Sequence, residues 1–533
     1  MKKLKLVCVA IAMAGAAPTF AGGLLTNTNQ HVAFNRMMSR EASIGIDGVY
    51  YNPAGVVFMG EGHHLAINWQ LAYQTRTINN DYKLFTNNVN NPITPRDFKG
   101  KAFAPVIPSF QYAYNKGKWS FQANFSLTGG GGKCTFDDGL GSFEKIVSET
   151  AIAACGLAGV VDQTLGNKLG QQGMEMFTSD QAFGKTGKYS FNSYMHGRQY
   201  YYGLSAGAAY KFCDNFSAFL GVRGVYALTN YYGYVENINV GNMPLYKVLD
   251  PTKENAANIE LSCDQTGVGF TPIIGVDYKT GRWNFSAKYE FKTRIRLKNK
   301  SVNQTPSIGN LPANLANQMT GILTARYQQA GLPLEQAKQQ AENTTNAVLN
   351  DPTVGATMMG LKTQFDQKLN KAIGEYEDGK KIAGDIPGYL ALGIGYSPVD
   401  AVRVNVGFHW FDDKNATSYN NRNKELKRGT LEYNAGVEVD VNKKITLSTG
   451  WQNTNYGLSD EYMDDKSFVI SSNSAAIGGV YHINKKMDLN VAYFHTFYQH
   501  KKTSETVKQT GKDYTSDYTR NNNVFAVGLD INF

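Results

Sequence analysis

Runs in which apolar and polar residues alternate recur along most of this chain, and they constrain its fold more than any other feature. In "WNFSAKYEFK" (283–292), every second residue from Trp283 onwards is apolar and the residues between are polar or charged. Such a run forms a β-strand with one apolar and one polar face. Similar runs begin near residues 63, 107, 118, 198, 215, 266, 283, 386, 401, 429, 444, 467, 486 and 521. We therefore expect an all-β protein of fourteen strands.

The connections between these runs alternate strictly between short turns and long loops. The short turns are "YNKGKW" (114–119), "KFCDNF" (211–216), "YKTGRW" (278–283), "YSPVDAV" (396–402), "DVNKKI" (440–445) and "HINKKM" (482–487). The long, polar loops span roughly 80–106, 130–197, 233–265, 298–385, 412–430, 458–466 and 504–520. Short turns at one end and long loops at the other are typical of transmembrane β-barrels. The sequence thus predicts a 14-stranded antiparallel transmembrane β-barrel over residues 63–533, with both of its ends on the periplasmic, short-turn side.

The composition fits this architecture. Charged residues make up 18% of the chain and aromatic residues 12%, and all five tryptophans fall on the apolar faces of the predicted strands. A soluble multi-domain β protein has a similar composition, so the connections decide between the two. No stretch after the N-terminal region has ~18 consecutive apolar residues, which predicts that helical membrane spans are absent. In a barrel the apolar faces meet lipid and the polar faces line the interior.

The first 21 residues have the features of a signal peptide. Three lysines precede an apolar stretch (6–17) that is too short to span a bilayer, and residues 19–21 suit cleavage. Removing these lysines lowers the formal net charge from +9 to +6, which is modest for this length and argues against a nucleic-acid partner. We expect export to the outer membrane of a Gram-negative cell.

A segment of about 40 residues without an alternating run, 22–62, separates the signal peptide from the first strand. It contains "REASIGIDGVYYNPAG" (40–55), and this run of small and acidic residues leading into Asn-Pro-Ala resembles the FadL family of outer-membrane transporters for long-chain fatty acids and aromatic hydrocarbons. The segment "DIPGYLALGIGYSP" (385–398) is similar to the strand opening that follows the longest loop in that family. The resemblance covers the layout of the whole mature chain.

The resemblance implies a mechanism of passive transport. Residues 22–62 would fold inside the barrel as a hatch. A hydrophobic ligand would be caught by a groove between the long loops and pass to an internal pocket, and a hatch movement would release it. A kink in the third strand would open a lateral exit into the membrane. Such a route suits apolar cargo, because burying each CH₂ is worth ~0.8 kcal/mol and a watery lumen is a barrier to it.

The candidate hatch motif is the turn Asn52, Pro53, Ala54 and Gly55. Pro53 fixes φ and biases Asn52 away from helix, and we expect Gly55 to permit a tight reversal through left-handed φ. The alternative is an ordinary turn before the first strand. Nearby apolar side chains either line the ligand route or pack the hatch; they are Phe34, Met37, Met38, Tyr50 and Tyr51.

A carboxylate cargo needs one or two positive groups near its pocket. The candidate ligand-binding residues on the inward faces are Arg223, Arg403, Lys288 and His409. Arg223 and Arg403 are favoured because apolar residues or glycine flank each of them. The alternative is internal ion pairing with the hatch and with inward acids, which include Glu290, Glu432 and Glu438.

Two of the long loops carry helical patterns. Residues 141–165 and 311–349 each place apolar side chains on one stripe. Outside the cell these stripes form either a groove that captures greasy ligand or contacts between neighbouring loops. The glycine run "TGGGG" (128–132) at the end of the third strand lacks the Lys-Ser/Thr of a phosphate-binding loop and predicts a kink or bulge.

The cysteines and the C-terminus add to the topology. Cys134 and Cys155 fall in one extracellular loop, so a disulfide between them and two free, buried thiols both fit the sequence. Cys213 falls in a periplasmic turn without a partner, so we expect it to be unpaired. The last strand ends at Phe533, which resembles the signal read by the barrel-assembly machinery.

No enzyme motif, metal site or cofactor site is predicted, because the eight histidines are scattered and no catalytic spacing occurs. We expect a monomer in contact with outer-membrane lipids and a hydrophobic small molecule. Three other functions would each need features of their own. A general diffusion porin would need an open lumen, and a barrel enzyme acting on lipids would need a Ser/His pair. A structural or adhesive surface protein would use the long loops.

Overall fold

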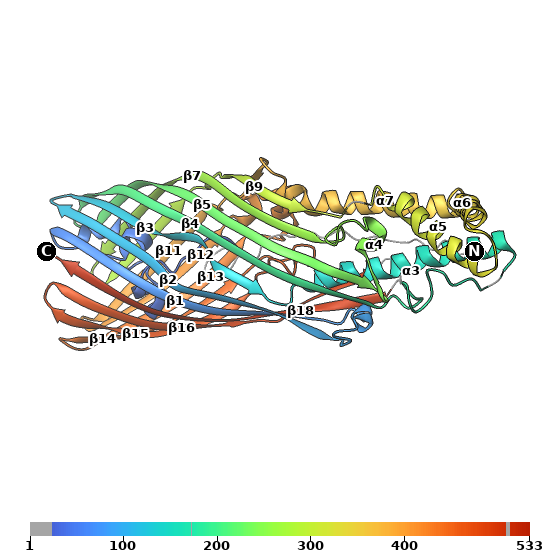
Figure 1. The fold of residues 1–533 in the computed structure, drawn as a ribbon. Helices are drawn as coiled ribbons and strands as arrows, with labels where there is room; N and C mark the ends of the chain where they lie inside the picture. The colour runs from blue at the N-terminus through green and yellow to red at the C-terminus, as the bar shows by residue number, and fades with distance from the viewer. Residues whose placement is uncertain (1–23, 172, 307, 508–511) are drawn as a thin grey trace.

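The computed structural model describes residues 24–171, 173–306, 308–507 and 512–533. The predicted signal peptide lies outside these residues. The described strands form one antiparallel sheet that closes on itself, because the first strand pairs with the last. Figure 1 shows a long barrel with short turns at one end and helices beyond the other. The predicted fold class, a 14-stranded barrel with an internal N-terminal segment and helical loops, is confirmed.

Within the described residues the wall of the barrel has fourteen strand positions, which we call staves. Each of three staves consists of two shorter strands separated by a break. The continuous staves are β1 (Gly62–Asn80), β2 (Arg96–Lys116), β3 (Trp119–Phe136), β4 (Tyr189–Cys213), β5 (Phe216–Val240), β7 (Ile259–Thr280), β12 (Val402–Phe411), β13 (Thr430–Asn442), β14 (Ile445–Asn455), β15 (Ser472–Asn484) and β18 (Lys512–Asn532). The interrupted staves are β8 (Trp283–Glu290) with β9 (Arg296–Gln304), β10 (Lys381–Ala383) with β11 (Tyr389–Val399), and β16 (Met487–Tyr498) with β17 (Lys501–Val507). A two-residue strand, β6 (Met243–Pro244), lies in the loop after β5.

Several staves reach further from the membrane than the sequence predicted. We expected strands to begin near 107, 198 and 266, and the structure begins them at Arg96, Tyr189 and Ile259. Beyond the bilayer an outward face no longer needs apolar residues, so the alternation that marked the strands disappears there. The upper part of β18 illustrates this, because its exposed side chains are polar. The loops are correspondingly shorter, and Cys134 lies in β3 rather than in a loop.

The outer surface of the barrel carries the predicted lipid-facing band. Trp69, Trp119, Trp283 and Trp451 are each more than two-fifths exposed, and so are large apolar residues from every part of the wall. The residues that alternate with them are buried and mostly polar. A closed sheet with an apolar outer face and a polar interior is a transmembrane β-barrel of the outer-membrane type.

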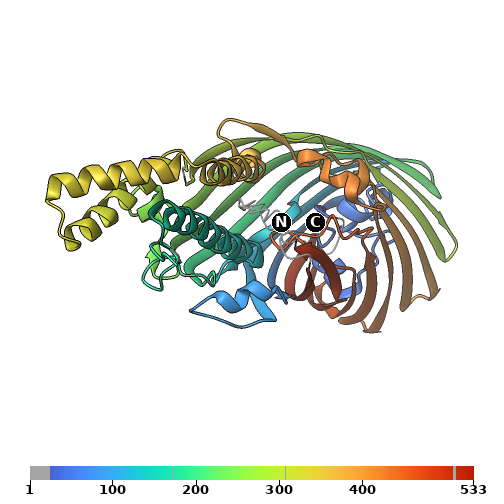
Figure 2. The same ribbon diagram turned by 90° about the vertical axis from the view of Figure 1, so that its right-hand side faces the viewer.

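Helices occupy two places. The N-terminal segment holds α1 (Val32–Met37), α2 (Gly48–Tyr51) and the 3₁₀ turn η1 (Gly55–Phe58). The loops hold η2 (Lys83–Asn87), α3 (Gly141–Leu169), α4 (Tyr246–Leu249), α5 (Leu311–Gln329), α6 (Leu334–Leu349), α7 (Pro352–Ile373), η3 (Gly374–Tyr376), η4 (Asp413–Asn415) and η5 (Tyr419–Glu425). Figure 2 shows α5 and α6 reaching sideways from the mouth of the barrel. The predicted helix over 311–349 is thus two helices.

Candidate functional site

The described part of the N-terminal segment, residues 24–61, lies inside the barrel and is called the plug below. Its helix α1 contacts the inner faces of β13 to β16, β18 and β1, whereas α2 contacts β2 and β3, and η1 contacts β3, β4, β5 and β7. Contacts with strands all around the wall require a central position. Phe34, Met38, Tyr50 and Tyr51 are buried together against the wall. These four aromatic and methionine side chains therefore pack the plug, one of the two roles that the sequence left open.

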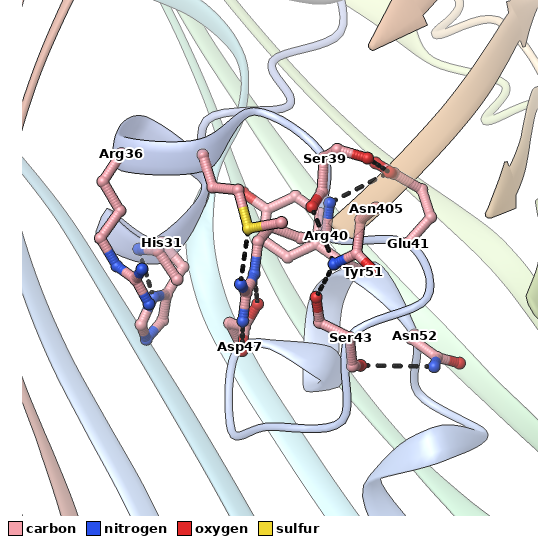
Figure 3. A network of polar contacts seen from close by, with 12 residues as sticks. His31, Arg36, Ser39, Arg40, Glu41, Ser43, Asp47, Tyr51, Asn52 and Asn405 are labelled. Carbon is pink, nitrogen blue, oxygen red and sulfur yellow. Dashed lines mark hydrogen bonds and ion pairs between the residues drawn. The ribbon is translucent and has the colours of Figure 1, made fainter. Parts of the chain in front are cut away.

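A network of buried ion pairs joins the plug to the wall, and Figure 3 shows its plug side, where Arg40 pairs with Asp47. Arg40 Nε lies 2.7 Å from Asp47 Oδ2 within the plug, and Arg40 Nη1 lies 2.9 Å from Oε2 of Glu438 on β13. Arg36 pairs with the other oxygen of Glu438. One wall carboxylate therefore holds two plug guanidinium groups, and all four side chains are almost fully buried.

His409, a predicted ligand contact, lies between two carboxylates. Its Nε2 is 2.7 Å from Oε1 of Glu41 in the plug, and its Nδ1 is 2.8 Å from Oε2 of Glu432 on the neighbouring strand. Gln452 and Thr454 also donate hydrogen bonds to Glu432. The imidazole therefore links the plug to a polar cluster on the wall.

Arg223 and Lys288, two more predicted ligand contacts, share one carboxylate. Arg223 Nη2 lies 2.7 Å from Glu290 Oε2, and Lys288 Nζ lies 2.9 Å from Glu290 Oε1. Lys288 also donates a 2.6 Å hydrogen bond to the carbonyl oxygen of Tyr50 and stands 4.2 Å from the centre of its ring. Tyr50 thus links the plug to this charged cluster.

Arg403, the fourth predicted contact, is one-third exposed near the periplasmic end and makes two 2.7 Å hydrogen bonds to Asp440. The structure thus brings Arg223, Lys288 and His409 against the plug and leaves Arg403 at the edge. Each of the four has internal ion pairs, which is the alternative that the sequence left open. Their contact with a ligand stays a prediction.

The turn Asn52-Pro53-Ala54-Gly55 contacts the wall at three points. Asn52 Nδ2 donates a 2.6 Å hydrogen bond to Asp277 Oδ2, and the carbonyl oxygens of Pro53 and Ala54 accept hydrogen bonds from Gln122 and Ser217. The predicted left-handed φ at Gly55 is wrong, because Gly55 belongs to a 3₁₀ turn and its φ is negative. Glycine is needed at this position because a larger residue would not fit: a Cβ at Gly55 would lie 2.4 Å from Asn52 Nδ2 and 3.1 Å from Asp277 Oδ2.

The predicted kink at 128–132 is present in β3. The pairing register with β4 shifts on both sides of Gly130, and Gly130 and Gly132 have φ of 73° and 96°. On the other side, β2 and β3 pair up to Phe103–Lys133, and pairing resumes only at Phe110–Phe125. Residues 104–109 of β2 therefore have no ladder partner in β3. We call this stretch the wall gap.

The sequence around the wall gap explains the lost pairing. Pro105 and Pro108 of β2 have no N–H to donate. Across the gap, the positive φ values of Gly130 and Gly132 turn the backbone of β3 away from a regular ladder.

Residues 25–30 of the plug lie against β3 at the wall gap from inside. Asn27 N–H donates to the carbonyl oxygen of Thr128 at 3.0 Å, and Asn27 Nδ2 donates to that of Gly130 at 2.6 Å. Gln30 reaches both strands: its Nε2 donates to Leu127, and its carbonyl oxygen accepts from Ser109. The plug therefore satisfies backbone groups of β3 that β2 leaves unpaired.

The two tyrosines that precede the turn hold this part of the plug. Tyr50 Oη donates to the carbonyl oxygen of Asn27 at 3.1 Å, and Tyr51 Oη donates to that of Thr28 at 2.6 Å. The segment that covers the wall gap is thus hydrogen-bonded to α2, which directly precedes the Asn-Pro-Ala-Gly turn. A shift of this turn would therefore act directly, through α2, on the residues that cover the wall gap.

An apolar pocket lies among the loops above the barrel, with a cavity volume of about 110 Å³. Its walls come from α3, α4 and α5, from the segment after α3 and from the start of β7, and they include Ile146, Leu157, Phe177, Val248, Ile259 and Leu315. Of the apolar residues that the helical pattern over 141–165 placed on one stripe, Phe143, Ile146, Val147 and Leu157 are buried, whereas Ile152 is 38% exposed. By length and composition α3 could also cross a bilayer. The sequence did not predict a helical span there, because α3 has no run of ~18 consecutive apolar residues. In the structure α3 packs among the loops.

Sequence reasoning missed some residues of the site. Asp277, the partner of Asn52, lies in "TPIIGVDYKT" (271–280), where its alternation with outward apolar residues marked it as inward. Asn27 and Gln30 gave no such signal, because their bonds are to backbone groups about 100 residues away. For the cysteines the structure has free thiols, with Cys134 and Cys155 buried and Cys213 exposed, so the prediction of an unpaired Cys213 is confirmed.

Comparisons with known proteins bear on the fold. No family model matches the chain, and no curated protein matches it. Among solved structures, a FadL homologue from Pseudomonas aeruginosa is similar over 98% of this chain and 100% of its own, with 14% identity and a TM-score of 0.57. The TodX deltaS2S3 mutant of a monoaromatic hydrocarbon channel is similar over 94% and 99%, with 13% identity and a TM-score of 0.50. The chain therefore has the fold of FadL-type barrels, a plugged outer-membrane β-barrel of fourteen strands.

Proposed function

We propose that the chain is a passive channel that carries hydrophobic small molecules from the cell exterior into the outer membrane. The solved structures that share its fold are described as a FadL homologue and as a monoaromatic hydrocarbon channel. Long-chain fatty acids, similar lipids and aromatic compounds are the corresponding cargo. The observation that carries the proposal is the wall gap, because an opening between two staves leads to lipid.

Cargo is first captured by the loops. The pocket between α3 and α5 presents almost only apolar side chains, and transfer of an apolar molecule from water to such a surface is favourable by ~25 cal/mol per Å². The pocket lies outside the polar lumen, so a molecule reaches it without crossing the charged clusters that surround the plug.

A second apolar surface lies inside the barrel next to the plug. Tyr201, Ile295 and Leu297 pack together on the inner wall, and Leu25 of the plug packs against them. Leu25 also accepts a hydrogen bond from the Gly130 N–H at the kink. Cargo that occupies this surface competes with Leu25, and displacement of Leu25 withdraws the plug from the wall gap. This competition is the proposed hatch step.

Release is lateral. Once residues 25–30 withdraw, the wall gap is covered only by side chains of β2 and β3. Phe103 and Val106, which lie at the gap on the outer face, are 53% and 63% exposed to lipid. A hydrophobic molecule passes between such side chains into the bilayer more favourably than through a polar lumen.

A removable clamp across the gap tests this route. A Cβ on Gly132 would lie 3.2 Å from the Cβ of Ala104, slightly short of the about 3.5–4.5 Å found in a disulfide, so a small movement apart would let the bond form. Ala104→Cys with Gly132→Cys, in a background without Cys134 and Cys213, should abolish delivery of a labelled fatty acid into proteoliposomes after oxidation. Reduction should restore delivery to the level of the same double variant before oxidation, which is the reference because a side chain at Gly132 adopts its positive φ only with strain.

The matched control clamps the same strands where they already pair. Tyr112→Cys with Ala123→Cys joins direct partners of β2 and β3 below the gap, and oxidation should leave delivery unchanged. If the gap clamp has no effect, the lateral route is wrong. If sugar influx accompanies delivery in both oxidised forms, the protein is a diffusion porin instead.

A further inference from the structure

Five basic side chains gather on the outer face of the wall beside the break between β8 and β9. They are Arg294, Arg296, Lys298, Lys300 and Lys381, and we call them the basic row. All five are exposed, whereas the intervening residues of the β9 stave, such as Ile295 and Leu297, are buried. Since successive side chains of a strand point to opposite faces, the basic row belongs to the surface that meets the membrane and its headgroups.

The height of the basic row follows from the strand register. Trp283 marks the periplasmic edge of the apolar band on this stave, and Arg294 is eleven residues further along. At the usual rise and tilt of a barrel strand, this separation spans about 26–30 Å along the membrane normal, against an apolar band of about 25 Å. On β7, Val268 and Phe270 are 59% and 67% exposed, and Thr266, just beyond them, pairs with Lys298. The basic row therefore begins where the hydrocarbon of the outer leaflet ends.

Most of these charges lack a protein counter-charge. Lys381 lies directly opposite Lys298 in the ladder, and like charges at opposed positions destabilise a sheet. Arg296 is 3.0 Å from Asp385. Among the described residues, no carboxylate lies within 4.0 Å of the side-chain nitrogens of the other four. Asp264 faces Lys300 in the register, but its carboxylate accepts a hydrogen bond from Asn230 instead.

We propose that the basic row binds the phosphate groups of lipopolysaccharide, the anionic glycolipid of the outer leaflet. A phosphate between Lys298, Lys381 and Lys300 removes the like-charge repulsion and forms charge-assisted hydrogen bonds with side chains that reach it from two staves. The acyl chains of the same lipid lie against Val268 and Phe270 below. The site belongs to the outside of the wall and is independent of the transport route.

The test is the lipid retained by the protein when it is released from vesicles containing bisphosphorylated lipid A and measured by native mass spectrometry. The variant Arg294→Gln/Lys298→Gln/Lys300→Gln keeps the Arg296–Asp385 pair. The control, Lys443→Gln/Lys444→Gln/Lys485→Gln, makes the same charge change in exposed periplasmic turns. Wild type and control should retain at least ten-fold more lipid A than the variant.

Two further arms complete the experiment. Lipid A without phosphates should be retained weakly by all three proteins, because the basic row recognises phosphate. The smaller variant Lys298→Gln/Lys381→Gln, which relieves the direct repulsion and leaves the other charges, should show an intermediate loss. Equal retention by variant and control overturns the proposal, as does equal retention of phosphorylated and dephosphorylated lipid by the wild type.

Discussion

At the scale of single residues, the plug is held by close contacts that tolerate little added volume. Gly55 shows this best: its backbone angles are open to any residue, yet Asn52 and Asp277 fill the space where a Cβ would go. Gly55→Ala should break the Asn52–Asp277 hydrogen bond and loosen the turn, while the strand ladder keeps the barrel folded. Influx of small sugars into proteoliposomes should rise.

Gly60→Ala is the matched control, because nothing lies within 4 Å of a Cβ placed there. It should leave sugar influx at the wild-type rate. Equal influx through both alanine variants would show that the turn does not hold the plug in place.

Asp413 is a residue whose charge should make stability depend on pH. It lies in the loop after β12, where burial raises its pKa to about 6, although hydrogen bonds from Thr430 and Leu24 oppose the rise. A raised carboxyl pKa means that the folded protein binds the proton more tightly than the unfolded chain. The stabilisation that this tighter proton binding gives the folded protein is therefore complete below about pH 4 and is lost as the pH rises to about 6. The free energy of unfolding should fall by about 3 kcal/mol over this range.

Urea unfolding at several pH values checks this expectation. In Asp413→Asn, which cannot ionise, the free energy of unfolding should fall less between pH 4 and pH 6 than in the wild type. The variant is less stable overall because it loses acceptors, so the slope with pH is the quantity to compare. Parallel slopes in the two proteins would contradict the assignment.

At the scale of elements, the sequence predicted the strands and short turns well but not the strand ends. The predicted turns, such as the one before Trp283, agree with the structure because the residues of a tight hairpin themselves determine its turn. The starts of β2 and β4 were misplaced because strands outside the bilayer lose their apolar face. The kink at Gly130 was predicted from composition, whereas the plug residues that cover it were not, since those hydrogen bonds join distant segments.

The helix α3 provides a test of ligand capture. Ala153 lines the apolar pocket on α3, so Ala153→Phe should fill part of the cavity and lower uptake of a labelled fatty acid several-fold at limiting concentration. Ala325→Phe makes the same substitution at an exposed position of α5 and should leave uptake unchanged. Equal uptake by the two variants would mean that the pocket does not take part in capture.

At the scale of the whole molecule, the strand count and the closure followed from the alternating runs and their connections, and the inward position of the N-terminal segment followed from the resemblance to the FadL family. The bonds that join plug to wall did not. His409 and Glu41 are 368 positions apart, and alternation showed only that His409 faces inward. Since pairing across a closed lumen depends on the register of every stave, it becomes visible only in three dimensions.

The attachment of the plug as a unit depends on one carboxylate of the wall. Glu438 is the wall carboxylate that pairs with both Arg36 and Arg40. Glu438→Gln leaves two buried guanidinium groups short of a counter-charge, and removing one partner of a buried ion pair costs about 3–5 kcal/mol. The barrel does not depend on this network, because its strands pair with each other.

Hydrogen exchange separates the two parts of the molecule. In Glu438→Gln the plug amides of residues 24–61 should exchange roughly a hundred-fold faster or more, as a loss of about 3 kcal/mol requires. The amides of the strands should keep their protection. Glu335→Gln, which breaks an exposed pair with Lys338 on α6, should change neither set, because such pairs contribute little. If the plug exchanges equally slowly in the two variants, the charged network does not hold it and packing of Phe34, Met38 and Tyr51 carries the attachment instead.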